Sequence, residues 1–170
     1  MASLMDDLIG VLESETAEYK KLIELSETMK QALIQSDVVM VENITTQEQD
    51  VTTGIQNMEH KRVQIMQNMA VVLNLKPEEL KVSMLESSLE KQPQQQKKLV
   101  AVRTELKHTM EELRRANQQN QVLIHQAMEL VEFDLNLFRS MRQAPETANY
   151  NKSAYNTGEL LGGGGFDAKQ

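Results

Sequence analysis

The fold is decided by residues 41–72, which read VENITTQEQDVTTGIQNMEHKRVQIMQNMAVV. Apolar residues recur along this stretch at alternating intervals of three and four, and two charged residues occupy the same stripe. The stripe comprises Val41, Ile44, Glu48, Val51, Ile55, Met58, Arg62, Ile65, Met69 and Val72. A heptad spacing sustained over this length is typical of helices that pack as coiled coils. The stretch therefore predicts a long amphipathic helix with at least one helical partner.

The segment before it supplies that partner. Residues 3–35 place apolar residues at helical spacing, from Leu4 and Leu8 to Met29 and Leu33. Ser36 and Asp37 then offer a helix cap, and so short a join forces the two helices into an antiparallel hairpin.

Two prolines mark the remaining helices. Pro77 predicts the start of a short connector helix that ends near Leu89, because proline suits the first helical position. Pro93 predicts the start of the last and longest helix, which ends near Gln143. The composition changes at Ala144-Pro145 to a stretch rich in Gly, Asn, Thr and Ser.

We therefore predict an all-α fold, an elongated antiparallel bundle of three long helices. It comprises a coiled-coil-like hairpin, a short connector helix and a long C-terminal helix. Residues 3–142 form the helical bundle, and residues 143–170 form a flexible, disordered C-terminal tail.

The composition excludes several classes of protein. The 170 residues hold 25 acidic and 18 basic side chains, and a net charge of −7 argues against binding nucleic acid or an anionic membrane. No apolar run is long enough for membrane insertion. The N-terminal residues MASLMDDLIG lack the basic start of a secretory signal, so we expect a cytoplasmic protein.

The residues offer little for catalysis. Cysteine is absent, and no phosphate-binding loop or nucleophile motif occurs. Glu105 and His108 have the Glu-x-x-His spacing of di-iron bundles, but a second such motif is missing, and we expect both side chains to face water. We therefore predict no enzyme activity, no cofactor and no catalytic or metal site. A di-metal bundle enzyme is the alternative that remains.

Polar residues on the apolar stripes have two interpretations. Glu15 lies on the stripe of the first helix, and antiparallel pairing places Arg62 within its reach. Such a pair sets the register of a hairpin more than it adds stability. Glu48, Asn117 and Asn120 resemble the polar layers that specify helix pairing. Polar contacts to a partner protein are the other interpretation.

The last third of the final helix carries more apolar residues than one stripe needs. One line comprises Ile124, Val131, Leu135 and Phe138, and a second comprises Leu123, Leu130, Leu137 and Met141, with Met128 and Phe133 beside them. A single neighbouring hairpin cannot easily cover so wide a face. Uncovered apolar surface of this kind indicates a partner site, and self-association is the alternative.

Several short segments resemble the FlgN family of flagellar export chaperones. Leu8…Leu12…Glu15…Tyr19…Leu22…Leu25 is similar to the family's first helix, Glu48…Met58-Glu59…Arg62 to its second, Asn117…Asn120…Leu123-Ile124 to the start of its binding region, and Tyr155…Gly158 to its ending. The resemblance covers about residues 4–142. The chain departs from the family pattern at Pro93–Gln96 and in its Gly-rich end.

The resemblance implies a function and a set of contact residues. Family members bind C-terminal helical segments of hook-associated proteins in the cytosol, prevent their premature assembly and deliver them to the flagellar type III export apparatus. By this resemblance the cargo surface is the end of the last helix together with the tail. The expected partner-binding residues are Asn117, Asn120, Leu123, Ile124, Ala127, Met128, Leu130, Val131, Leu135, Phe138, Met141, Tyr150 and Tyr155. A self-associating coiled-coil scaffold without an export role is the alternative, and the same face allows a weak homodimer.

Overall fold

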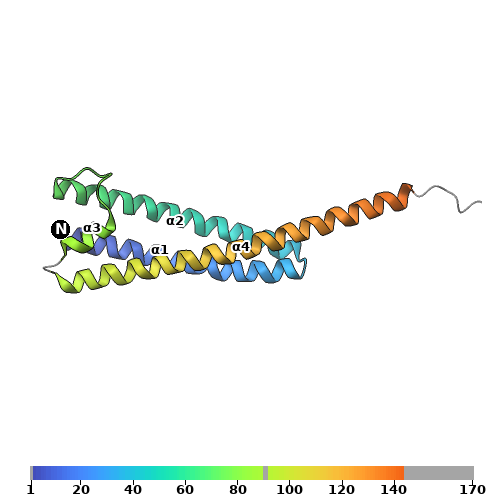
Figure 1. Cartoon of the computed structure of the whole chain (residues 1–170), viewed down its shortest axis with the longest axis horizontal. Helices are drawn as coiled ribbons and strands as arrows, with labels where there is room; N and C mark the ends of the chain where they lie inside the picture. Colours follow the sequence, from blue (N-terminus) through green and yellow to red (C-terminus); the bar gives the residue numbers. More distant parts are fainter. Residues whose placement is uncertain (1, 90–91, 144–170) are drawn as a thin grey trace, which may run out of the picture. The chain divides into compact units, whose positions relative to one another are not determined.

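The computed structural model describes residues 2–89 and 92–143. These residues form four α-helices, α1 (Ala2–Ile34), α2 (Val38–Leu73), α3 (Val82–Ser88) and α4 (Pro93–Gln143), and no strand occurs among them (Figure 1). The prediction of an all-α fold with three long helices and a short connector is therefore confirmed. None of the described helices is long and apolar enough to cross a membrane.

The chain divides into two compact units, Met1–Ala127 and Met128–Gln170. The first unit holds α1, α2, α3 and the first part of α4. The described part of the second unit is the remainder of α4. The predicted flexible tail falls almost entirely on residues 144–170, outside the described residues.

The hairpin of α1 and α2 forms because two capping devices coincide at the join. Ser36 adopts a left-handed conformation (φ 55°), and the Asp37 backbone N–H donates to the Ala32 carbonyl over 2.9 Å, which closes the C-terminus of α1. The Asp37 carboxylate then accepts a hydrogen bond from the Met40 backbone N–H at the N-terminus of α2. The predicted cap at this join is confirmed.

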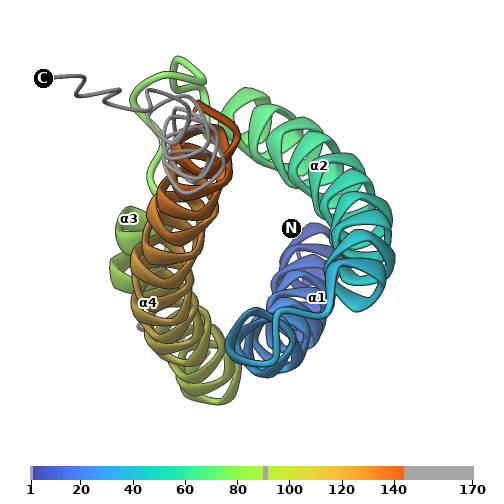
Figure 2. The ribbon, with the colours of Figure 1, turned by 90° about the vertical axis from the view of Figure 1, so that its right-hand side faces the viewer.

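The main apolar core of the first unit lies where all four helices contribute. Leu8 and Leu12 of α1 pack with Met69 of α2, Leu85 of α3 and Leu99 of α4, and all five side chains are buried. A smaller cluster beside the α1–α2 join contains Met29, Ala32 and Ile44. Figure 2 shows α1 between α2 and α4 in this unit, so α1 is the central helix.

The connector was predicted imperfectly. Residues 77–79 form a turn closed by the Glu79 N–H and the Lys76 carbonyl, and Lys81 is extended (φ −112°, ψ 149°), so α3 begins at Val82 and not at Pro77. The break allows Leu80 to point into the main core together with Leu85 and Leu89. Burying Leu80 therefore stabilises the fold more than a continuous helix starting at Pro77 would.

One position of the stripe in residues 41–72 was also predicted wrongly. Val72 is exposed while Ala70 is buried. An α-helix has 3.6 residues per turn and drifts against a strict heptad, so the buried position shifts by one or two residues along a long helix.

Candidate functional site

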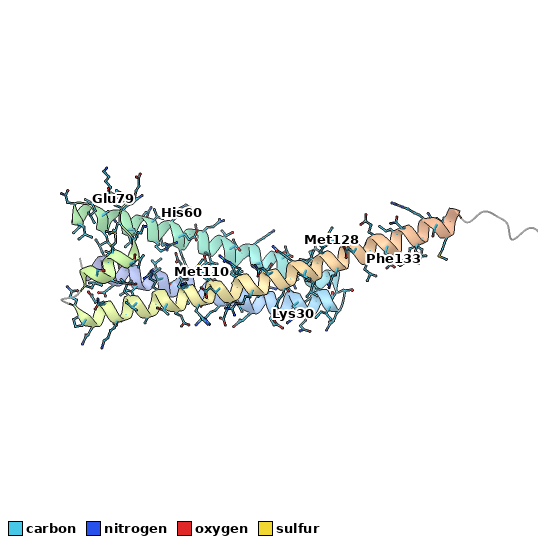
Figure 3. All side chains as sticks on the ribbon, viewed as in Figure 1. Lys30, His60, Glu79, Met110, Met128 and Phe133 are labelled. Carbon is cyan, nitrogen blue, oxygen red and sulfur yellow. The ribbon has the colours of Figure 1, made fainter. Side chains whose placement is uncertain are left out.

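The most conspicuous surface lies on α4 in the second unit. Every described side chain from residue 128 to residue 142 is exposed, and eight of them are large and apolar. These eight are Met128, Leu130, Val131, Phe133, Leu135, Leu137, Phe138 and Met141, which we call the C-terminal apolar face. Each is at least 48% exposed, and Figure 3 shows Met128 and Phe133 on this part of the helix. So much exposed apolar area on one short helical stretch is typical of a surface that another helix covers.

The predicted contact residues nearer the start of α4 lie in the first unit and differ in exposure. Ile124 and Asn117 are exposed, Leu123 and Ala127 are half-buried, and Asn120 is buried. Ile124 is thus the most accessible apolar residue of this group. Tyr150 and Tyr155 lie outside the described residues.

Asn117 and Asn120 meet α1 at Ser26. The Asn120 Nδ2 donates a hydrogen bond of 2.8 Å to the Ser26 carbonyl, and the Ser26 hydroxyl donates to the Asn117 Oδ1 over 3.0 Å. Ser26 is itself buried. This polar layer aligns α4 with α1, which supports the register interpretation for Asn120. The Asn120 Oδ1 is buried without a hydrogen-bond partner, a local cost of the arrangement.

Glu15 and Arg62 form a second polar layer, between α1 and α2. The Arg62 Nε donates to the Glu15 Oε1 over 2.9 Å, and the Glu15 side chain is 2% exposed while that of Arg62 is 33% exposed. Burial raises the pKa of Glu15, and the hydrogen bond and charge of Arg62 only partly oppose that effect. The structure thus brings these two residues together within the hairpin.

Glu48 lies apart from both layers. Its side chain is half-buried on α2, and burial raises the pKa of its carboxyl group. The ion pairs found among the described residues do not include it. Glu48 therefore lies on the half-buried stripe of α2, as the sequence predicted, and none of the described basic residues forms an ion pair with it.

The first unit also contains a surface that the sequence analysis missed. An open groove of about 940 Å³ runs along α4, lined by ten α4 residues and by Tyr19 of α1. We call it the α4 groove. Its apolar lining is Leu106, Met110 and Leu113, and its basic lining is Arg103, Lys107 and Arg114. These three basic residues recur beside the apolar stripe of α4, and that pattern in the sequence could have predicted the α4 groove.

Tyr19 lines this groove from α1 and also interacts with α2. Burial raises the pKa of the Tyr19 hydroxyl, and the negative charges of Glu59 and Glu15 raise it further. Because Glu59 belongs to α2, the Tyr19 side chain lies beside α2 as well as α4.

Glu105 and His108 face solvent, as the sequence predicted. The Lys20 Nζ donates to the Glu105 Oε1 over 2.6 Å across the α1–α4 contact, and this hydrogen bond and charge lower the pKa of Glu105. His108 Nδ1 lies 3.6 Å from the Glu112 Oε2. Nowhere in the described chain do three or more His, Asp or Glu side chains gather in an arrangement suited to a metal ion.

The fold and these surfaces define a class of protein: an all-α helical module with a large exposed apolar face. The family model described as FlgN protein matches residues 1–158. The chain therefore belongs to the FlgN family of flagellar export chaperones, a family that binds flagellar proteins. No curated protein and no solved structure matches the chain.

Proposed function

We propose that this chain binds the C-terminal helical segments of hook-associated proteins in the cytoplasm. By covering them it prevents premature assembly, and it then delivers them to the flagellar type III export apparatus. Membership of the FlgN family supports the general role. The observation that carries the finer proposal is the C-terminal apolar face, whose eight apolar side chains are all exposed.

In this proposal the cargo segment packs against the chaperone helix first and against its filament neighbours later. A filament-type protein assembles through amphipathic terminal segments, and such a segment presents an apolar stripe before it is assembled. The C-terminal apolar face offers a matching stripe on a helix that is already formed, so at this face the conformational entropy is lost by the cargo segment. That cost keeps the affinity moderate and favours later release.

The proposed contact set extends beyond this face in both directions. On one side it includes Ile124, which is exposed in the first unit. On the other side it includes Tyr150 and Tyr155, on the strength of the family resemblance. Asn117 is accessible for a polar contact at the same end, whereas the buried Asn120 acts through the position of α4.

A binding experiment with C-terminal fragments of the hook-associated proteins tests this proposal. Ile124→Asp combined with Val131→Asp should weaken binding by about tenfold or more, because both charges enter the apolar contact. Val71→Asp combined with Val72→Asp is the matched control, since both residues are exposed valines on α2. It should leave the affinity unchanged.

Calorimetry of each variant, with helicity measured by circular dichroism, separates a lost contact from a lost fold. A second comparison uses the chain with and without residues 144–170, and removal of these residues should weaken cargo binding. Equal affinities for the Ile124/Val131 variant and the wild type, with helicity intact, would overturn the proposed face. Failure of every hook-associated fragment to bind would favour a self-associating scaffold.

A further inference from the structure

The α4 groove and the C-terminal apolar face have the same spacing of contact residues. The groove presents Arg103, Leu106, Met110 and Leu113, at intervals of three, four and three. The face presents Met128, Val131, Leu135 and Phe138, again at intervals of three, four and three. Two helices with the same heptad spacing can interdigitate along their whole contact.

In an antiparallel pairing, the apolar residues of the groove lie opposite apolar residues of the C-terminal apolar face. Leu113 then lies opposite Met128, Met110 opposite Val131, and Leu106 opposite Leu135. The last pair in this register is Arg103 with Phe138, a guanidinium beside an aromatic ring. Each apolar residue of the groove thereby gains an apolar partner.

The charges are compatible with the antiparallel order. In this register Lys107 lies within one turn of Glu132, and the two residues flank the apolar line on the same side. The groove lining holds three bases and one acid, Glu111. Residues 128–134 hold Glu129, Glu132 and Asp134 and no base. Opposite charges therefore flank the apolar line on the two surfaces.

A parallel order fits less well. It preserves the apolar spacing, but it joins residue 103 of one chain to residue 128 of the next. That head-to-tail contact leaves one surface free at each end and does not close. An antiparallel pair uses both surfaces of both chains about a two-fold axis and is complete as a dimer.

We infer that the α4 groove is the docking site for residues 128–138 of a second copy of this chain, in a reciprocal antiparallel dimer. Each copy inserts its C-terminal apolar face into the α4 groove of the other. The dimer buries both surfaces that the single chain leaves exposed. It is a resting form of the chaperone, held by the same face that the cargo is proposed to occupy.

This inference deepens the proposed function without depending on it. If cargo binds the C-terminal apolar face, the second copy and the cargo compete, and cargo binding dissociates the dimer. The dimer itself is tested with no cargo present, so its failure and the failure of the proposed function are distinguishable.

A charge-exchange experiment tests the register. One variant carries Lys107→Glu with Arg114→Glu, which reverses the charge of the groove. The other carries Glu132→Lys with Asp134→Lys, which reverses the charge of the inserted helix. All four side chains are exposed, so both variants should keep the helicity of the wild type.

Sedimentation equilibrium on the full chain gives the readout. The wild type should show a monomer–dimer equilibrium, and each variant alone should dimerise at least about tenfold more weakly, because like charges meet at both contacts. The equimolar mixture should recover wild-type dimerisation, because both contacts of the heterodimer then join opposite charges. A wild type that stays monomeric overturns the inference, and so does a mixture that fails to recover.

Disulfide trapping checks the orientation, since the chain has no native cysteine. Chains carrying Met110→Cys and chains carrying Val131→Cys should cross-link when mixed and oxidised. The matched control pairs Met110→Cys with Leu135→Cys, which a parallel order would bring together. Faster cross-linking of the control pair would overturn the antiparallel dimer.

Discussion

Arg62 on α2 donates a hydrogen bond of 2.9 Å to the buried carboxylate of Glu15 on α1. The pair joins residues 47 positions apart in the sequence and so fixes which turn of α2 lies beside which turn of α1. Because a buried charge is costly without its partner, the two residues make unequal contributions when each is removed.

Arg62→Met should therefore destabilise the hairpin. The substitution leaves the Glu15 carboxylate buried and unpaired, which we expect to lower the free energy of unfolding by about 1–3 kcal/mol. Urea denaturation followed by circular dichroism measures the change. Lys61→Met is the matched control, because Lys61 is the exposed neighbour on the same helix. Equal stability of the Arg62→Met variant and the control would show that water already satisfies the carboxylate.

Glu15→Gln should change how stability depends on pH. Burial raises the pKa of Glu15 above its ordinary value of 4.5, so the native state holds the proton more tightly than the unfolded state. The stability that this contributes is full below about pH 4.5 and is lost as the pH rises through the native pKa. Glutamine resembles the protonated acid and does not titrate. The free energy of unfolding of the variant should therefore fall less than that of the wild type as the pH rises.

Unfolding free energies measured between pH 4 and pH 8 test that expectation. Glu48→Gln is the comparison, because burial also raises the pKa of Glu48 and no ion pair among the described residues opposes it. The double variant should show the flattest profile of the four proteins. A Glu15→Gln profile as steep as that of the wild type would contradict the raised pKa.

The long helices and the hairpin were predictable because each rests on many repeated local signals. The stripe of residues 41–72 and the cap at Asp37 point to the same structure, and Pro93 begins α4 as expected. The start of α3 was not predictable in this way. It depends on burying Leu80 against Leu8 and Leu99, residues distant in sequence, and tertiary packing of this kind overrides a local signal such as Pro77.

The candidate surfaces were predictable to different degrees. The excess of apolar residues after Val122 indicated the C-terminal apolar face directly. The α4 groove was missed because Leu106, Met110 and Leu113 follow an ordinary core stripe. Only the packing of α4 against α1 decides which side of that stripe stays open. The sequence also left the role of Asn120 open, and its hydrogen bond to the Ser26 carbonyl supports the register interpretation.

Asn120→Asp should loosen the contact between α4 and α1. The substitution replaces the amide that donates to the Ser26 carbonyl with a carboxylate, which places two acceptors together in a buried site. We expect a loss of about 2–3 kcal/mol in the free energy of unfolding. Gln119→Asp is the control with the same charge at the adjacent exposed position. Hydrogen exchange should rise in α1 around Ser26 in the first variant alone, and protection equal to the control would contradict the structural role.

Asp37→Ala should destabilise α2 through the loss of its cap. The Asp37 carboxylate accepts from the Met40 backbone N–H over 3.0 Å, and alanine leaves that donor without a side-chain partner. Caps of this type contribute about 1 kcal/mol, so thermal unfolding should shift downward. Asp50→Ala, at an exposed position within the same helix, is the control for the removed charge. A shift no larger than that of the control would mean that the cap adds nothing at this join.

Ser36→Gly should stabilise the hairpin. Ser36 and Asn74 end α1 and α2 in the same left-handed conformation, each with φ 55°, and the residue after each donates its N–H back into the helix. Serine is strained there, whereas asparagine tolerates this region and glycine adopts it freely. Relief of the left-handed strain contributes about 1–2 kcal/mol, and the added entropy of the unfolded chain costs about 0.5–1 kcal/mol. We therefore expect Ser36→Gly to raise the free energy of unfolding by about 0.5–1 kcal/mol. Asn74→Gly should give a smaller gain, because less strain is relieved at that position. Urea denaturation of the two variants in parallel makes the comparison, and a larger gain at Asn74 would contradict this account of the α1–α2 join.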